Sequence, residues 1–113
     1  MTDKAFSPVD IQVQNENGVV VVKWGDGHAS RFPIRHLRGY CPCAVCQGHS
    51  QGGLKWIDNK VVTIFDAQLV GRYAVNFKFG DAHDTGIYRW ELLRKLDPDE
   101  QQRWGAPEAI GRV

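Results

Sequence analysis

Residues 24–43, WGDGHASRFPIRHLRGYCPC, contain the signals that decide how this chain folds. A Gly-Asp-Gly turn comes first, and a short apolar and polar alternation follows around Phe32. IRHLR at residues 34–38 has the composition of a short helix, and Gly39 after it is a favoured helix-stop residue. Cys41 precedes a proline and is therefore biased towards extended backbone. The stretch predicts a strand, a helix and then a tight loop that carries cysteines.

Two pairs of strands are predicted on either side of this stretch. Residues 9–14, VDIQVQ, alternate apolar and polar side chains, and the turn signal NENG connects them to the β-branched run VVVVKW at residues 19–24. Farther along the chain, residues 61–70 and 73–79 have similar compositions, VVTIFDAQLV and YAVNFKF, with a turn expected at residues 71–72. The sequence therefore predicts at least two hairpins.

Residues 86–96, GIYRWELLRKL, form the most clearly amphipathic segment. Ile87, Trp90 and Leu93 are spaced by three and would share one face of a helix. A sheet needs an apolar layer against its inner face, and this helix would supply one. We therefore expect a small single α+β domain, with an antiparallel sheet of about five strands and a helix over residues 86–95 packed on it.

Two further segments complete the outline. Residues 97–104, DPDEQQRW, predict a short helix with Asp97 as the N-cap, Pro98 in the first position and Glu100 completing a capping box. Residues 47–60 hold three glycines and little periodicity, so we expect a mobile surface loop there.

The stretch at residues 24–43 has an echo at residues 79–99, FGDAHDTGIYRWELLRKLDPD. Both contain an aromatic-Gly-Asp-x-His turn and a Leu-Arg pair, and then Cys-Pro-Cys in the first and Asp-Pro-Asp in the second, with one residue inserted. Common turn and capping residues also produce such echoes by chance. If the echo is a repeat, a strand-turn-helix unit is used twice and His83 corresponds to His28.

Composition narrows the class of protein. A chain of 113 residues and 12.8 kDa is typical of one soluble domain with its own core. Fourteen Lys and Arg against thirteen Asp and Glu leave a formal charge of +1, so we expect no nucleic acid as partner. No apolar run approaches the ~20 residues of a membrane span, and MTDKAFSPVD does not have the pattern of a signal peptide. We expect a cytoplasmic protein without membrane contact.

All three cysteines of the chain, Cys41, Cys43 and Cys46, fall within six positions. An odd number of closely spaced thiols does not form a disulfide framework. A metal ion accounts for all three, because a C-x-x-C turn directs two sulfurs to one ion and Pro42 stiffens the C-x-C step before it. Simple burial of small side chains explains such clustering less well.

Zinc is the metal that this pattern favours, because three thiolates and one histidine are a common structural zinc set. Three thiolates around a divalent ion leave a net charge of −1, which Arg35 and Arg38 lie close enough in sequence to moderate. An iron–sulfur cluster would need a fourth cysteine or a substitute, at other spacings. A redox-active dithiol of Cys43 and Cys46 is the competing interpretation, although it leaves Cys41 unexplained.

The fourth ligand can come from any of four histidines. His49 is three residues after the last cysteine but lies in the glycine-rich segment, whereas His83 would close a loop of nearly forty residues, where a clip contributes more. His28 and His36 are further candidates. The pattern of residues alone favours His83 and His49 equally.

The elements W-x-D-G-H, LRGYCPCAVC and DAHDTGIYRWELLRKL resemble the small N-terminal domain of gamma-butyrobetaine hydroxylase. That domain also occurs as a standalone bacterial protein of unknown function and attached to some iron–sulfur scaffold ATPases. The resemblance extends from about Val9 to Leu96. It implies one domain at residues 9–104, between an N-terminal tail at 1–8 and a C-terminal tail at 105–113 that we expect to be frayed.

In the hydroxylase this domain binds a structural zinc through three motif cysteines and a histidine of the later Asp-x-His turn. By position, the resemblance implies the metal ligands Cys41, Cys43, Cys46 and His83. Iron is the alternative metal. Ala82 stands where glycine is frequent in that turn, and His28 in the earlier turn remains an alternate ligand.

The resemblance does not imply an oxygenase. The hydroxylase reaction takes place in a separate jelly-roll domain, and only thirty residues follow His83, too few for such a domain. We therefore expect a non-catalytic zinc-binding module with a protein partner, and the family fusions suggest an accessory in metal-cofactor or iron–sulfur protein assembly. The alternative function is a small thiol oxidoreductase.

Overall fold

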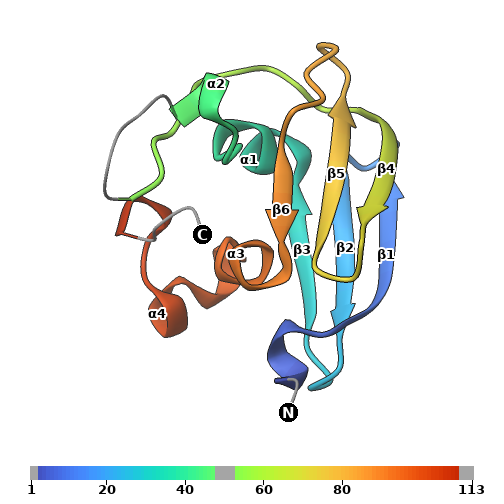
Figure 1. Ribbon diagram of the computed structural model, residues 1–113, viewed down its shortest axis with the longest axis vertical. Coiled ribbons are helices and arrows are strands. Elements are labelled where there is room, and N and C mark those ends of the chain that lie inside the picture. The colour runs from blue at the N-terminus through green and yellow to red at the C-terminus, as the bar shows by residue number, and fades with distance from the viewer. Residues whose placement is uncertain (1–2, 48–52, 110–113) are drawn as a thin grey trace.

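The computed structural model describes residues 3–47 and 53–109, and six strands in these ranges form two antiparallel sheets (Figure 1). One sheet has the order β1-β2-β3 (Pro8–Gln14, Val19–Trp24, Ala29–Pro33) and the other β4-β5-β6 (Ile64–Val70, Ala74–Phe79, Ile87–Arg89). The predicted α+β class and both hairpins are confirmed. The single sheet of about five strands is wrong, because within the described ranges the strands form two separate three-stranded sheets.

Short helices follow the strands. They are α1 (Ile34–Gly39), α2 (Ala44–Gln47), α3 (Trp90–Lys95) and α4 (Gln101–Trp104), with 3₁₀ turns η1 (Lys4–Phe6), η2 (Pro98–Glu100) and η3 (Pro107–Ala109). In Figure 1, α1 and α3 lie on the side of β3 and β6, away from β1 and β4. None of the helices in the described part of the chain is long and apolar enough to cross a membrane.

The helix predicted over residues 86–95 begins only at Trp90. Residues 87–89 form β6 instead, where Tyr88 pairs with Val75 and is fully buried while Ile87 is 44% exposed. A spacing of three between Ile87 and Trp90 fits one face of a helix, but it also fits a strand that turns directly into a helix. Pairing with β5 decides in favour of the strand.

The echo in the sequence corresponds to a duplication in the structure. Each half consists of three antiparallel strands followed by a helix, β1-β2-β3-α1 and then β4-β5-β6-α3. The central strands occupy equivalent registers, with Val20 opposite Phe32 in the first half and Val75 opposite Tyr88 in the second. Both edge strands also have an irregularity near their start, at Pro8/Asp10 and Ile64/Asp66.

One core joins the two halves. Buried side chains of both sheets and of the helices belong to a single cluster, which includes Val20, Val22, Trp24, Phe32, Leu37, Val75, Phe77, Phe79, Tyr88, Leu92, Leu93 and Leu96. The two sheets therefore pack face to face. The turns of one half lie next to the residues that follow the helix of the other half. This arrangement brings residues far apart in the sequence into contact.

The segment after α2 is more closely packed than its glycines suggest. His49 lies outside the described residues, but Leu54 is buried and its N–H donates to the Pro107 carbonyl at 3.1 Å. The ring of Trp56 packs against Gly39, where an added Cβ would lie 1.8 Å from it. Pro107, which the sequence assigned to a frayed tail, is buried in η3, so the described part of that tail is ordered against the domain.

Candidate metal centre

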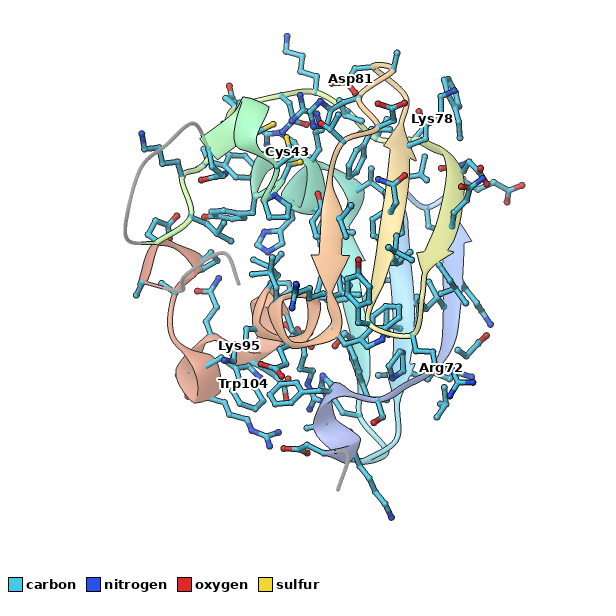
Figure 2. The ribbon with its side chains drawn as sticks, in the orientation of Figure 1. Cys43, Arg72, Lys78, Asp81, Lys95 and Trp104 are labelled. Atoms are coloured by element: carbon cyan, nitrogen blue, oxygen red, sulfur yellow. The ribbon has the colours of Figure 1, made fainter. Side chains whose placement is uncertain are left out.

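The three cysteines and one histidine meet at one end of the molecule, where Figure 2 labels Cys43 and Asp81. Nε2 of His83 lies 3.2 Å from Sγ of Cys41, 3.4 Å from Sγ of Cys43 and 3.4 Å from Sγ of Cys46. All four ligand atoms lie within 4.8 Å of one another, so this cluster can hold a metal ion.

Of the four candidate histidines, the structure brings His83 to the sulfurs. His28 contacts Asp97, and the His36 ring bonds to the Leu96 carbonyl at 2.7 Å. His49 cannot be compared because it lies outside the described residues. His83, the long-range partner that the resemblance implied, thus lies against all three sulfurs.

The cysteine loop is shaped by the end of α1 and by one turn of helix. The Cys43 carbonyl accepts the N–H groups of Cys46 at 3.2 Å and Gln47 at 2.9 Å, which closes the C-x-x-C turn. The side-chain amide of Gln47 donates to the Cys41 carbonyl at 2.8 Å in a buried contact. These bonds direct the three sulfurs to one side of the loop.

The turn that carries His83 is fixed by hydrogen bonds of its own and by an arginine from the other half. The Phe79 N–H donates to the His83 carbonyl at 2.8 Å, and the Asp81 carboxylate accepts the His83 N–H at 3.1 Å. Nε of Arg38 donates to Asp81 at 2.9 Å, and its Nη1 lies 3.4 Å from Sγ of Cys46. Arg38 therefore links both parts of the cluster.

Of the two arginines expected to lie near the thiolates, Arg38 does so. Arg35 instead bonds to Asp58 at 2.5 Å and lies over the Trp56 ring. The sequence analysis missed the Arg38–Asp81 pair, although both residues stand in the repeated motif.

Space around the sulfurs depends on a glycine. Cys41 is fully buried, whereas Cys43 and Cys46 are partly exposed. A Cβ on Gly86 would lie 2.7 Å from Sγ of Cys41, closer than such contacts allow. Only glycine at this position leaves room for the buried sulfur, which fits a site that has to accommodate large ligand atoms.

The three thiols differ in acidity. Burial raises the pKa of the Cys41 thiol, and burial together with the adjacent Cys43 thiolate raises the pKa of Cys46. Burial also opposes ionisation of Cys43, but hydrogen bonds from Thr85 and from the neighbouring cysteines lower its pKa to about 6. A divalent cation would stabilise all three thiolates at once, because a coordinated thiol is deprotonated.

A model of the family described as gamma-butyrobetaine hydroxylase-like, N-terminal, matches residues 11–94, which span both halves and the whole cluster. The chain belongs to this family. The comparison with curated proteins found no match.

Solved structures share the fold of this gamma-butyrobetaine hydroxylase-like domain. A crystal structure of a protein of unknown function of the DUF971 family from Acidithiobacillus ferrooxidans is 37% identical, with a TM-score of 0.71, and the match covers 86% of this chain and 99% of that one. Two solution structures are each 28% identical, with TM-scores of 0.64 and 0.68. Their matches cover 86% and 92% of this chain and 77% and 80% of theirs.

A second cluster is formed by His28, Asp97 and Glu100, in which His28 and Asp97 correspond to His83 and Cys41 and Glu100 corresponds to Ala44. Nε2 of His28 lies 2.6 Å from Asp97 and 3.7 Å from Glu100. As in the first cluster, a histidine from a turn of one half meets residues that follow the helix of the other half. The echo signalled this correspondence, but the sequence analysis did not predict the cluster.

An arginine already neutralises the second cluster. Arg94 corresponds to Arg38 and is fully buried, and it donates to Glu100 at 2.5 and 3.0 Å and to Asp26 at 3.0 and 3.2 Å. Hydrogen bonding to Arg94 lowers the pKa of Glu100 to about 2. Glu100 therefore does not complete the predicted capping box, whereas Asp97 caps η2 by accepting the Asp99 N–H at 2.8 Å, as predicted.

Proposed function

We propose that this domain is a non-catalytic zinc-binding module in which one ion joins the two halves of the duplicated fold. The observation that supports it is the convergence of three sulfurs from the first half on the imidazole of His83 from the second. Cys41 and His83 are 42 residues apart in sequence, so the ion would close a long loop. Binding free energy at such a site contributes to folding.

The donor set favours zinc. Three thiolates and one imidazole satisfy a tetrahedral ion without an open position, which is typical of structural sites and leaves no place for a substrate. Iron in the same donors would be coloured and redox-active, so metal analysis and an absorption spectrum distinguish the two metals.

Metal content tests the ligand set. Protein purified without added metal should contain one equivalent of zinc by mass spectrometry, and His83→Ala should lose it on dialysis. His28→Ala is the matched control, because it removes the corresponding histidine of the other half, and it should retain zinc. Cobalt-substituted protein should show sulfur-to-cobalt charge-transfer absorption that weakens in Cys46→Ser. Zinc retained by His83→Ala, or lost by His28→Ala, would reject the assignment.

The cellular role that we propose is an accessory of metal-cofactor or iron–sulfur protein assembly that acts with a protein partner in the cytoplasm. Three free thiols are consistent with a reducing compartment. The fusions of related domains to iron–sulfur scaffold ATPases support the assembly role. Cells without the protein should have lower activity of iron–sulfur enzymes, restored by the wild-type chain but not by His83→Ala. Unchanged enzyme activity would contradict this role while leaving the zinc site intact.

A small thiol oxidoreductase is the second candidate function. The sulfurs of Cys43 and Cys46 lie within 4.8 Å of each other and both residues are partly exposed, which a dithiol needs to reduce a disulfide substrate and become oxidised itself. In this case metal-free protein should equilibrate with thiol and disulfide buffers near thioredoxin potentials and should reduce insulin. Thiols that react only after a chelator is added favour the zinc module.

A further inference from the structure

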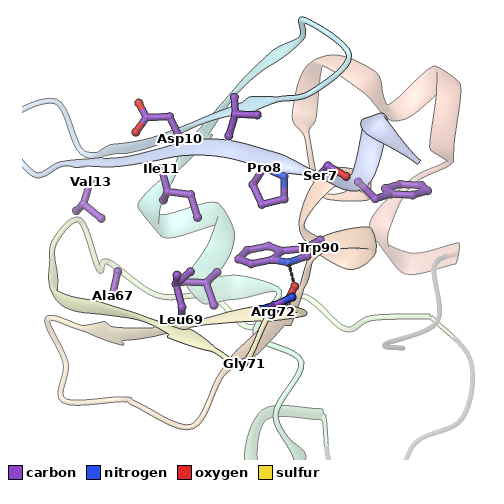
Figure 3. Close-up of a pocket in the computed structure, with 13 residues that line it drawn as sticks. Ser7, Pro8, Asp10, Ile11, Val13, Ala67, Leu69, Gly71, Arg72 and Trp90 are labelled. Atoms are coloured by element: carbon purple, nitrogen blue, oxygen red, sulfur yellow. Dashed lines mark hydrogen bonds between the residues drawn. The ribbon is translucent and has the colours of Figure 1, made fainter. Parts of the chain in front are cut away.

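A groove with a volume of about 650 Å³ lies between the edge strands β1 and β4, and its lining residues include none of the metal cluster (Figure 3). Its walls are mostly apolar and include Pro8, Ile11, Leu69, Val75 and Trp90. Leu69 is 70% exposed although its ladder partner Val75 is buried, so it projects from the inner face of its sheet into open space. The core is thus left uncovered at this edge.

A side-chain clamp joins β1 and β4 beyond the end of this groove that Val13 and Ala67 line. The amide of Asn15, just after β1, donates to the Ile64 carbonyl at 2.9 Å and accepts the Ile64 N–H at 2.8 Å at the start of β4. β1 and β4 run in opposite directions (Figure 1), so the groove extends from Val13 and Ala67 near the clamp towards Pro8 and Trp90 (Figure 3).

The opposite end of the groove is lined by an aromatic ring, that of Trp90, and by a cation, Arg72. The indole N–H of Trp90 donates to the Arg72 carbonyl at 2.8 Å, which satisfies its polar atom and leaves the ring to line the groove (Figure 3). Within residues 3–47 and 53–109, the Arg72 guanidinium makes no ion pair. The acid on the same rim, Asp10, accepts the Gln12 amide at 2.9 Å and stands opposite Lys23 in the ladder.

We propose that this groove binds an unbranched aliphatic carboxylate, with its chain between β1 and β4 and its carboxylate on Arg72. An apolar groove lined at one end by a cation that makes no ion pair within the described residues is complementary to such a molecule. The volume lies within the range of small-molecule sites. This inference is independent of the metal centre.

A peptide strand fits the groove less well. The Asn15 side chain already bonds to both backbone groups of Ile64, and the Ala67 N–H on β4 is already bonded to the Asp66 carboxylate at 3.0 Å. A strand that adds to a sheet needs free backbone groups along the edge and room to continue beyond it. An aliphatic chain needs neither.

Decanoate is the probe for the experiment, with zinc-loaded full-length protein and binding measured by calorimetry and amide chemical shifts. We expect saturable one-to-one binding, with shift changes in β1, β4 and the Trp90 indole. Arg72→Gln should weaken binding roughly tenfold, because it removes the charged partner of the carboxylate. Leu69→Asn should weaken it as well. Ile87→Asn, which replaces an exposed apolar residue outside the groove, should bind as the wild type does.

Several results would overturn the proposal. They are the absence of saturable decanoate binding, equal affinity for decyltrimethylammonium, shift changes away from the groove, and an Arg72→Gln variant with unchanged affinity. Binding to phosphatidylglycerol vesicles without decanoate binding would assign the surface to membranes instead. A dimer by light scattering that Leu69→Asn converts to a monomer would assign it to a second copy. Thermal midpoints of all variants show that they remain folded.

Discussion

The two clusters of this domain occupy equivalent places in a duplicated scaffold, yet they are held together by different chemistry. In each, a histidine of an aromatic-Gly-Asp-x-His turn contacts residues that follow the helix of the other half. An arginine of that helix forms an ion pair with the aspartate of the same turn. His28 meets Asp97 and Glu100, and Arg94 pairs with Glu100, whereas His83 meets three sulfurs and Arg38 contacts that of Cys46. The fold brings the residues together in both places, and the residues after the helix decide whether they form salt bridges or a candidate metal centre.

The difference also explains a contrast in packing around the two clusters. In the alignment of the two halves that places Phe32 on Tyr88, Ser30 of the first half corresponds to Gly86 of the second, and its hydroxyl accepts the Trp24 indole N–H at 2.8 Å. No such side chain fits at residue 86, because Cys41 occupies the space. A serine is therefore compatible with the salt-bridged cluster, whereas the cysteine cluster requires a glycine.

Removing zinc should produce the largest loss of stability, and the loss should be confined to the cluster of cysteines and His83. Chelation of zinc should lower the free energy of unfolding by about 4 kcal/mol or more, the linkage expected when free zinc exceeds its Kd a thousandfold. Hydrogen exchange should accelerate first near His83 and the cysteine loop, while the Arg94 cluster keeps its protection. A thermal midpoint unchanged by the chelator would contradict a structural role for the metal.

Arg94→Met should destabilise the second cluster by an amount comparable to that of metal removal. It leaves Asp26 and Glu100 without their buried cation, and loss of one partner of a buried pair typically costs about 3–5 kcal/mol. Denaturant unfolding measures the loss, and zinc content should remain at one equivalent. Arg103→Met is the control, because Arg103 is half exposed and its contact with Glu100 is long at 3.5 Å. Equal destabilisation by both variants would show that burial of Arg94 is unimportant.

Gly86→Ala should weaken the metal centre without removing a ligand. Its methyl group would press on Sγ of Cys41, and displacements of this kind around metal ligands typically cost about 10- to 100-fold in affinity. Competition with a chromophoric chelator measures the affinity. Ser30→Ala, the corresponding change in the other half, should leave zinc affinity unaltered. If Gly86→Ala binds zinc as tightly as the wild type, the sulfur has space that the structure does not show.

Lowering the pH should reduce the free energy of unfolding by about 1 kcal/mol through Glu100 of the second cluster. Arg94 lowers the pKa of Glu100 from 4.5 to about 2, so the unfolded state binds this proton more readily than the folded state. The contribution of Glu100 is therefore present above pH 4.5 and is lost as the pH falls towards 2. In metal-free protein, Glu100→Gln should flatten the dependence of unfolding free energy on pH in this window. An unaltered slope would indicate that Glu100 does not bond to Arg94 in solution.

Much of the fold could be predicted because its signals are local. The β-branched runs and turns specify both hairpins, and Gly39 marks the end of α1. The start of α3 could not be read, since a spacing of three between Ile87 and Trp90 fits both a strand followed by a helix and a continuous helix. Only the ladder between Tyr88 and Val75 distinguishes them. Division into two sheets depends on long-range packing, which no local pattern encodes.

The candidate site was predictable to the same extent. Clustered cysteines indicate a metal by themselves, but His83 is brought to them by the relative placement of the two halves, and spacing alone ranked it equally with His49. The resemblance supplied that choice. The Arg94 cluster was missed because its members are common surface residues, and burial by the opposite half is what turns them into a network. The echo of the two Asp-x-His turns was the available signal.

Ala82→Gly should have the smallest effect and should make the two turns alike. Ala82 has φ of 64°, in the left-handed region, and the corresponding residue of the first turn is Gly27 with φ of 91°. An L-residue pays about 1–2 kcal/mol in this conformation, and glycine avoids that strain but loses about 0.5–1 kcal/mol in chain entropy. The net gain should be about 0.5 kcal/mol, or a rise of roughly 2–4 °C in thermal midpoint. Zinc affinity should not change, because Asp81 still accepts the His83 N–H.

The reverse change in the other turn, Gly27→Ala, should lower the midpoint. If Ala82→Gly is destabilising instead, the methyl group has a packing role, and the two turns differ by more than the residue that adopts the left-handed conformation.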